Sequence, residues 1–451
     1  MSSFDLRVMG GTLIGTEESR SNLYVAGGKV ALCDVETHPA LGTVDASGLL
    51  VLPGMVDAHV HLMDPGDSTR ETFPTGTAAA VANGVTTIIE HTHGHPVRTV
   101  AELDHKLDHL RGRARADYGL AAHVWSDNLA DLADLWAAGV AYFKIFTCST
   151  HGVPAIEGED LRNALADIAR IGGTCLIHCE DDSMTAAAEQ HLRATGRTDP
   201  GLLIEWRTRS AEKTAVEAVL ALAAQTDVRA TIAHVSTPET ARLVAEARSR
   251  GVDVVAETCP QYLHLREDEV YTQGPLRKFT PPARIRSDAE EDMMWRLLDR
   301  GGFGYLSTDH APSTLAQKSS GTMWDVHFGL PGLDTTLALL MEAVAAGRMA
   351  WTRLVGLYSE APARRYGLYP RKGHLGVGAD ADFVLVDPHR SWQIGERPYL
   401  SGAGWSPYTG RRVRGWVHAT YLRGVPAALE GDPQGELRGA FVEPQPLRRR
   451  S

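Results

Sequence analysis

In the middle of the chain, short apolar runs alternate with amphipathic stretches of helical period. The runs are strand candidates at residues 55–62, 85–92, 118–125, 141–147, 174–180, 230–236, 252–260 and 303–311. Helical patterns lie between them, for example at 158–172 and at 237–251, which ends on Gly251. Buried parallel strands are typically continuous apolar runs joined by helical crossovers. The pattern therefore predicts an α/β fold, a (β/α)8 barrel of the TIM type.

The two ends of the chain follow a different pattern. Residues 1–53 and the segment after about residue 370 alternate apolar and polar positions between Gly-containing turns, which is typical of β hairpins. We expect both ends to pair into one small β-sandwich, which gives domain segments 1–53, 54–366 and 367–451. The tail from Asp432 is rich in proline and arginine, and we expect it to fray.

Composition narrows the class of protein. The chain has 451 residues, 43% of them hydrophobic, which suffices for a large barrel and an accessory module. A net charge of −11 argues against nucleic acid or an anionic membrane as the partner. The sequence shows neither a secretory signal nor a run of about 20 apolar residues that could span a bilayer. Five cysteines without CxxC spacing indicate no disulfide framework, and we expect a cytoplasmic protein.

Polar side chains that can bind a metal ion stand at the carboxyl ends of several predicted strands, where barrel enzymes place their active sites. These residues are His59, His61, Lys144, His178, His234 and Asp309. Because His59 and His61 are two apart on a strand, they share a face and can hold one ion. Lys144 is the hardest to explain structurally, since a buried amine is costly unless it is paired or modified.

Each residue also has a purely structural interpretation. HxH can arise by chance in a histidine-rich chain, and His178 and His234 could be hydrogen-bonded core histidines. Asp309 could be a helix N-cap. The coincidence of all six at strand ends of one barrel favours a metal site.

The chain resembles the cyclic amidohydrolases: dihydroorotases, allantoinases, and hydantoinases or dihydropyrimidinases. The resemblance rests on GMVDAHVHLMDPG, FKIF, LIHCED, IAHVST, ETCPQYL, PPARIRSD and STDHAP, and on KGHLGVGADADFVLVDP near the end. These motifs extend over nearly the whole chain, from Leu6 to about Gly424. The resemblance implies a hydrolase that opens the C–N bond of a small cyclic amide, and a homo-oligomer, either a dimer or a tetramer.

The resemblance also implies roles for the six residues. His59, His61 and Asp309 would hold one divalent ion, and His178 and His234 a second. Lys144 would be carboxylated and bridge both. Imidazole and oxygen ligands suit Zn²⁺, although Mn²⁺ or Co²⁺ could substitute. A metal-activated water would attack the amide carbonyl. Asp309 would carry its proton to the leaving nitrogen as general base and then acid.

Departures from the motifs of each class bear on the substrate. Met63 stands where dihydroorotases have an arginine, and Ser149 where hydantoinases have a tyrosine. The remaining motifs resemble those of allantoinases. The hydantoinase, dihydropyrimidinase and dihydroorotase alternatives stay open, as does another cyclic imide or amide. The candidate substrate contacts are Met63, His93, Ser149, Pro282 and His310.

The segment after the second predicted strand reads EHTHGHP and carries His91, His93 and His95. Allantoinases usually have an apolar segment there. The three histidines could belong to a solvated loop, contact the substrate or bind a third cation.

Two other classes of function fit these residues less well. A scaffold protein of this fold would have lost the ligand set, which is intact here. A deaminase or a hydrolase of linear amides belongs to the same superfamily, but deaminases usually lack the bridging lysine. Lys144 therefore favours a binuclear hydrolase.

Overall fold

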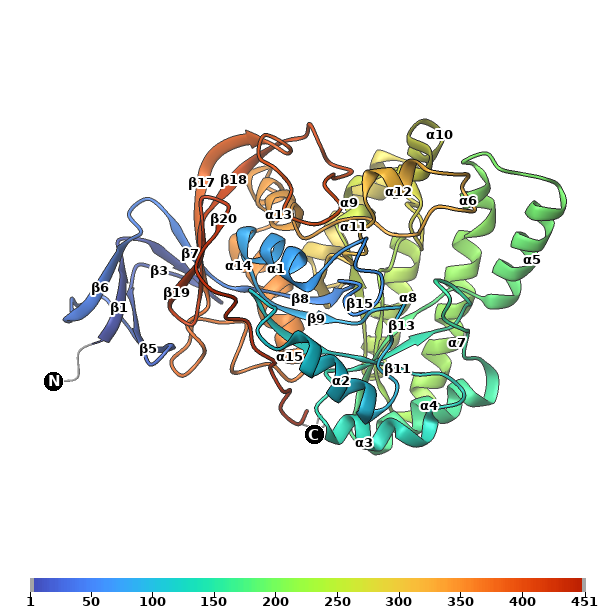
Figure 1. The fold of residues 1–451 in the computed structure, drawn as a ribbon, viewed down its shortest axis with the longest axis horizontal. Coiled ribbons are helices and arrows are strands. Elements are labelled where there is room, and N and C mark those ends of the chain that lie inside the picture. The colour runs from blue at the N-terminus through green and yellow to red at the C-terminus, as the bar shows by residue number, and fades with distance from the viewer. Residues whose placement is uncertain (1–3, 448–451) are drawn as a thin grey trace.

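The computed structural model describes residues 4–447, a mixed α/β arrangement with parallel strands at its centre (Figure 1). All eight predicted strands are present, the third in two pieces. Their bounds are β8 Met55–Val60, β9 Val85–Glu90, β10 Asp117–Leu120, β11 Ala122–His123, β12 Phe143–Phe146, β13 Thr174–His178, β14 Arg229–Ile232, β15 Val254–Thr258 and β16 Tyr305–Leu306. They pair in parallel in the orders β10-β9-β8 and β11-β12-β13-β14-β15-β16.

A parallel bridge joins the first of these strands to the segment after the last one. Val60 pairs with His310, and the His61 amide donates to the His310 carbonyl oxygen at 2.8 Å. The carboxyl end of β8 therefore lies beside residues 309 and 310. In the other sheet, Phe146 of β12 is in register with His178 of β13. These pairings bring residues far apart in the sequence to one end of the strands.

Helices alternate with the strands, as the sequence predicts. The predicted helix at 237–251 is α8 (Pro238–Ser249), and the Thr237 hydroxyl caps it by accepting from the Thr240 amide. Gly251 follows with φ of 95°, a conformation that favours glycine. The other helices are α1 Phe73–Ala82, α2 Val100–Leu110, α3 Leu132–Ala137, α4 Gly158–Arg170, α5 Asp182–Ala194, α6 Leu202–Trp206, α7 Arg209–Thr226, α9 Gln261–His264, α10 Glu269–Gln273, α11 Asp288–Asp299, α12 Leu315–Ser319, α13 Thr336–Ala345, α14 Trp351–Val355 and α15 Ala361–Arg365.

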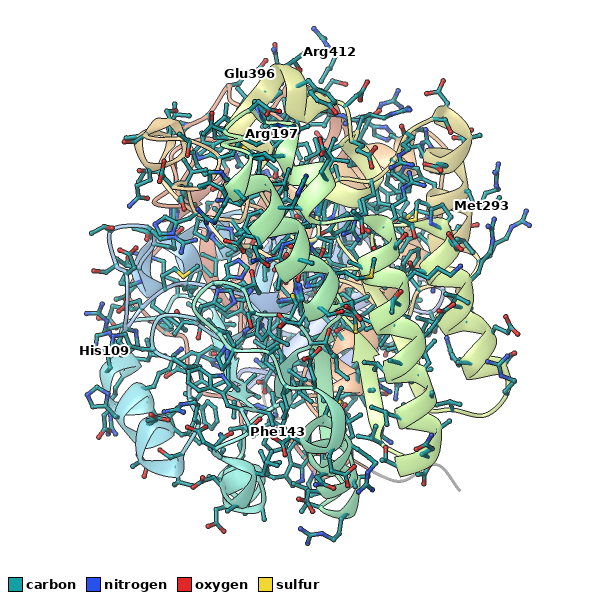
Figure 2. The ribbon with its side chains drawn as sticks, turned by 90° about the vertical axis from the view of Figure 1, so that its right-hand side faces the viewer. His109, Phe143, Arg197, Met293, Glu396 and Arg412 are labelled. Carbon is teal, nitrogen blue, oxygen red and sulfur yellow. The ribbon has the colours of Figure 1, made fainter. Side chains whose placement is uncertain are left out.

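The helices cover the strands and bury their apolar side chains. Figure 2 turns the right-hand side of Figure 1 to the viewer, where α5 and α7 lie in front of the strands. Phe143, Ile177 and Ile232 are fully or almost fully buried in the central apolar cluster. Each fully buried side chain of this size stabilises the fold by about 1.5–3 kcal/mol. None of the helices within residues 4–447 combines the length and the apolar character that crossing a membrane requires.

Two further sheets lie beside the central strands (Figure 1). Their strands are β1 Phe4–Met9, β2 Thr12–Ile14, β3 Glu18–Ser19, β4 Asn22–Ala26, β5 Lys29–Asp34, β6 Ala40–Asp45, β7 Leu50–Pro53, β17 Phe383–Gln393, β18 Arg412–Leu422, β19 Val425–Leu429 and β20 Asp432–Pro433. One sheet has the order β5-β4-β1-β6 and the other β20-β19-β18-β17-β7-β2-β3. The predicted pairing of the two chain ends is thus confirmed in the second sheet. Apolar side chains of both sheets, among them Val8, Leu23, Val51 and Phe383, form one buried cluster.

The predicted fraying of the tail is wrong for the described residues. Tyr118 donates its amide to Ala440 and accepts from the Val442 amide, at 3.0 and 2.8 Å. The Gln445 amide donates to the Gly367 carbonyl, and Val442 is fully buried. A proline- and arginine-rich segment can dock in this way because alternate backbone groups pair with β10. Residues 448–451 lie outside the described part.

Candidate metal centre

The six predicted ligands come together in one small cavity at the carboxyl ends of the strands. Five strands, or the residues directly after them, supply these side chains: β8, β12, β13, β14 and β16. The cavity is lined by His59, His61, His93, Lys144, Phe146, His151, His178, His234, Thr280, Asp309, Ala311 and Gly329. Its volume of about 20 Å³ is room for about one water molecule.

His59, His61 and Asp309 form the first group of ligand atoms. The Nε2 atoms of His59 and His61 each lie 3.3 Å from Asp309 Oδ1. Each ring uses its other nitrogen elsewhere: His59 Nδ1 donates to Glu257 Oε2 at 2.9 Å, and His61 Nδ1 donates to the His91 carbonyl at 2.6 Å. Both Nε2 atoms therefore present lone pairs to a carboxylate oxygen. Two imidazole nitrogens and a carboxylate oxygen that converge in this way are typical ligands of a divalent ion, so this donor set fits a metal ion.

His178 and His234 form the second group. His178 Nδ1 lies 2.9 Å from His234 Nε2, and His178 Nε2 donates to Glu180 Oε2 at 3.0 Å. Burial alone would raise the pKa of Glu180, but the charges of Arg207 and Arg284 outweigh it and hold that pKa well below its ordinary value. Glu180 is therefore an anion that holds the Nε2–H of His178 and leaves Nδ1 as the ring nitrogen without a proton, as carboxylates do for metal-ligating histidines.

Lys144 lies between the two groups. Its Nζ is 3.1 Å from His59 Nε2, and the side chain is 1% exposed. Burial lowers the pKa of Lys144 to about 8, against the opposing charge of Asp309. A fraction of the amine is therefore neutral near pH 7, the form that can react with CO₂. Burial also raises the pKa of Asp309, with His59 acting against that rise.

Backbone strain accompanies two of the six residues. His234 and Asp309 have φ values of 37° and 49°, in the left-handed region that residues other than glycine rarely adopt. Such conformations cost on the order of 1–3 kcal/mol each and are concentrated at functional sites. The helix-cap interpretation of Asp309 is wrong, because the next helix, α12, begins at Leu315 and is capped by Thr314.

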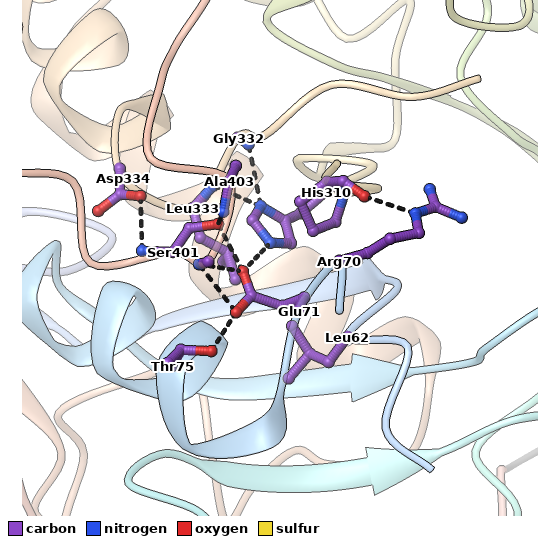
Figure 3. Close-up of polar contacts among 12 residues, drawn as sticks. Leu62, Arg70, Glu71, Thr75, His310, Gly332, Leu333, Asp334, Ser401 and Ala403 are labelled. Atoms are coloured by element: carbon purple, nitrogen blue, oxygen red, sulfur yellow. Dashed lines mark hydrogen bonds and ion pairs between the residues drawn. The ribbon is translucent and has the colours of Figure 1, made fainter. Parts of the chain in front are cut away.

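The candidate substrate contacts differ in whether they line the cavity. His93 lines the cavity, whereas Met63, Ser149, Pro282 and His310 are absent from its lining. His310 Nδ1 accepts from the Gly332 and Leu333 amides, and its Nε2 lies 3.4 Å from Glu71 Oε2. Figure 3 shows this ring between the Gly332 segment and Glu71. His310 is thus a fixed neighbour of Asp309, with both ring nitrogens engaged.

Sequence reasoning missed several residues of the site. Phe146, His151 and Thr280 line the cavity, and Glu257 and Glu180 orient His59 and His178. Glu257 and Glu180 could have been found, because they too are polar residues at the ends of apolar runs. His151 gave no signal, since it lies in a loop and reaches the cavity through a left-handed backbone with φ of 55°.

The histidines after β9 do not form one solvated loop. His91 is 1% exposed, and neither its ring nitrogens nor those of His93 have a hydrogen-bond partner within residues 4–447. The same holds for His123 at the end of β11. Burial lowers the pKa of His91, His93 and His123 well below the ordinary value, so these rings are neutral. The solvated-loop interpretation is therefore wrong for His91 and fits only the exposed His95.

A much larger cavity lies elsewhere in the described chain. It measures about 930 Å³ and is lined by several arginines, including Arg229, Arg353 and Arg365, and by none of the six ligand candidates. Arg229 opens β14 and Gly304 precedes β16, so this cavity lies at the amino ends of the strands. Barrel enzymes use the opposite end. The six ligand candidates line the smaller cavity at the carboxyl ends of the strands instead.

Comparisons with known proteins identify the family of the chain. The model of the amidohydrolase family matches residues 50–427. An allantoinase from Deinococcus radiodurans is 34% identical, over 99% of this chain and 100% of its own, and one from Rubrobacter xylanophilus is 34% identical over 99% of both. A solved L-hydantoinase (dihydropyrimidinase) from Arthrobacter aurescens is 30% identical, with a TM-score of 0.93 over 98% of this chain and 100% of that one. The chain belongs to the amidohydrolase family.

Proposed function

We propose that the protein hydrolyses the C–N amide bond of a cyclic amide or ureide at a binuclear metal centre, and that its substrate resembles allantoin. The observation that carries this proposal is the convergence of His59 Nε2 and His61 Nε2 on Asp309 Oδ1, each at 3.3 Å. The allantoinases at 34% identity over the full chain support the ring chemistry.

The fold supports this proposal. We infer that the eight parallel strands form a closed (β/α)8 barrel, which the Val60–His310 bridge supports by linking the first strand to the segment after the last. We also infer that the two outer sheets form a β-sandwich, supported by their shared apolar cluster. The segments 1–53, 54–366 and 367–451 stay predictions, as do a homo-oligomeric state and a cytoplasmic location.

The residues present fit two divalent ions. His59, His61 and Asp309 would hold one, His178 and His234 the other, and a carboxylated Lys144 would bridge them. Zn²⁺ suits this imidazole and oxygen set, with Mn²⁺ or Co²⁺ as alternatives. When bound, such ions lower the pKa of water and polarise the amide carbonyl.

The chain's own residues would move the proton. Asp309 takes the proton of the attacking water and passes it to the ring nitrogen as the C–N bond breaks. Its burial favours this exchange, because the pKa of the carboxyl is raised. Glu257 and Glu180 hold His59 and His178 in place through the hydrogen bonds described above. Because the cavity holds about one water, a ring substrate needs more room than this structure provides.

The ring class follows from Met63 and from the relatives. Met63 provides no charge for the carboxylate of dihydroorotate, so we expect negligible turnover of that ring. Hydantoinase-like activity is the second candidate, supported by the L-hydantoinase structure at a TM-score of 0.93.

A ring-opening panel of allantoin, hydantoins, dihydrouracil and dihydroorotate tests the proposal. We expect turnover of allantoin or a hydantoin by the wild type and none by Lys144→Ala, with short carboxylic acids restoring part of the activity. Efficient dihydroorotate hydrolysis would overturn the ranking of substrates. Full activity of Lys144→Ala would overturn the binuclear mechanism.

A further inference from the structure

His91 follows β9 and lies against the first pair of candidate ligands. Its ring centroid is 4.2 Å from that of His61 and 5.1 Å from that of His59. The backbone fixes this placement, since the His91 amide donates to the Val60 carbonyl and the His91 carbonyl accepts from His61 Nδ1. The imidazole is therefore held beside the two rings by the strand pairing of β8 and β9.

The ring nitrogens of His91 differ from those of its two neighbours. His59 and His61 each donate through Nδ1 to a fixed oxygen. Both nitrogens of His91 are buried without a partner in the described chain. A buried imidazole pays a desolvation penalty for each such nitrogen, so a ligand outside the polypeptide is expected to occupy at least one of them.

The positions of the nitrogens point to the same ion as His59 and His61. One ring nitrogen of each of the three histidines lies within 4.8 Å of those of the other two. We propose that His91 is a third imidazole ligand of the ion that His59 and His61 would hold. This proposal rests on the proposed function and adds a residue to its metal centre.

Two other histidines provide an internal comparison. His93 and His123 also have buried, unpartnered nitrogens. Neither belongs to a group of ligand atoms within 4.8 Å among residues 4–447. The His123 ring lies 5.4 Å from His91 and comes from the neighbouring strand. His123 is therefore a matched control for the loss of a buried, unpartnered imidazole.

A third imidazole would make the two metal positions unequal. The first would have His59, His61, His91 and Asp309, whereas the second has the imidazoles of His178 and His234. Nitrogen-rich sites favour later first-row metals over Mn²⁺. We therefore expect the first position to hold Zn²⁺ longer against a chelator than the second.

Chelator release from the fully zinc-loaded full-length protein tests this ligand. Dipicolinate is added, and zinc remaining on the protein is measured over time. The wild type should lose one ion quickly and one slowly. Losing even an outer-sphere partner lowers metal affinity about 10- to 100-fold. His91→Ala should therefore accelerate the slow phase by at least about tenfold, while His123→Ala should leave it near the wild-type rate.

The Co²⁺-loaded protein gives a second readout that does not depend on activity. The visible absorption of Co²⁺ should change in His91→Ala and in His91→Gln, the second variant in case the alanine variant does not fold, but not in His123→Ala. An unchanged slow phase and spectrum in the His91 variants would overturn the proposal, as would equal effects of His91→Ala and His123→Ala. A wild type that binds no divalent ion would instead overturn the proposed function itself.

Discussion

The candidate metal centre and the junction between the central strands and the outer sheets are both buried and polar. They differ in how their charged side chains are paired. At the junction, Lys372 Nζ lies 2.5, 2.8 and 2.7 Å from carboxylate oxygens of Asp117, Asp380 and Asp382, and Arg423 pairs with Asp117. At the candidate metal centre, His59 Nε2 and His61 Nε2 each lie 3.3 Å from Asp309 Oδ1, and the nearby amine of Lys144 has a pKa that burial lowers to about 8.

The comparison separates a structural cluster from a ligand site. Asp117, Asp380 and Asp382 have oxygen atoms close enough together to hold a metal ion. Lys372 already supplies their positive charge, so this cluster is satisfied within the chain. Convergence of ligand atoms is therefore a weak criterion alone. Convergence around an amine whose pKa is lowered, as at Lys144, is the stronger criterion, because the aspartates around Lys372 raise the pKa of that amine instead.

The largest expected effect is on catalysis, at the candidate metal centre. Asp309→Asn keeps the shape of the side chain but cannot accept the proton, so turnover of the ring substrate should fall about 10²- to 10⁴-fold. Metal analysis should find most of the ions retained, because five other ligand candidates remain. The acidic limb of the pH–rate profile should move or disappear. A metallated variant with wild-type turnover would assign the proton transfer to another group.

At the cluster of Lys372 with Asp117, Asp380 and Asp382, the expected effect is on the free energy of unfolding. Lys372→Met removes the ion-pair partner of Asp382 and one of the partners of Asp117 and of Asp380, which should cost about 3–5 kcal/mol in the free energy of unfolding measured with urea at pH 7. Lys213→Met is the control, because its pair with Glu239 is exposed and should contribute less than about 1 kcal/mol. Turnover by the folded Lys372→Met variant should match the wild type. Equal stability of the two variants would contradict this account.

The same cluster predicts a pH dependence. Burial alone would raise the pKa of Asp380, but Lys372 and its other partners outweigh it and lower that pKa. The stabilisation is therefore present above the ordinary aspartate pKa of about 3.9 and is lost as pH falls through the lower, folded value. The stability gap between wild type and Lys372→Met should shrink below about pH 4. A gap that stays constant down to pH 2 would argue against ion pairing.

The smallest effect is expected on Zn²⁺ affinity, at Glu257, which contacts a candidate ligand and is not a candidate ligand itself. Glu257→Gln removes the negative charge that holds Nδ1–H of His59, so Zn²⁺ affinity should fall about 10- to 100-fold in competition with a chelator. Glu239→Gln, on the exposed face of α8, is the matched control. If both variants bind Zn²⁺ as tightly as the wild type does, metal affinity does not depend on the hydrogen bond that orients His59.

Much of the fold could be predicted because apolar runs and helix caps are local signals. The helix at 237–251 follows from Thr237, Pro238 and Gly251 without any tertiary information. The docking of residues 439–445 could not be predicted. It depends on unpaired backbone groups of β10, Ala114 and Gly367, which no local composition encodes.

The candidate site shows the same limit. The six ligand candidates were found from one rule, polar residues at strand ends, because a barrel collects those ends. The burial of His91 and the arrival of His151 at the cavity depend on loop backbone and on neighbouring strands. The engagement of both His310 nitrogens likewise required the positions of Gly332 and Glu71.

Metal content measured together with ring opening tests the central claim most directly. The purified protein should contain about two divalent ions per chain, lose turnover when a chelator removes them, and regain it as Zn²⁺, Mn²⁺ or Co²⁺ is restored. Protein freed of metal, with less than about one ion per ten chains, that still opens the ring at the wild-type rate would contradict the account.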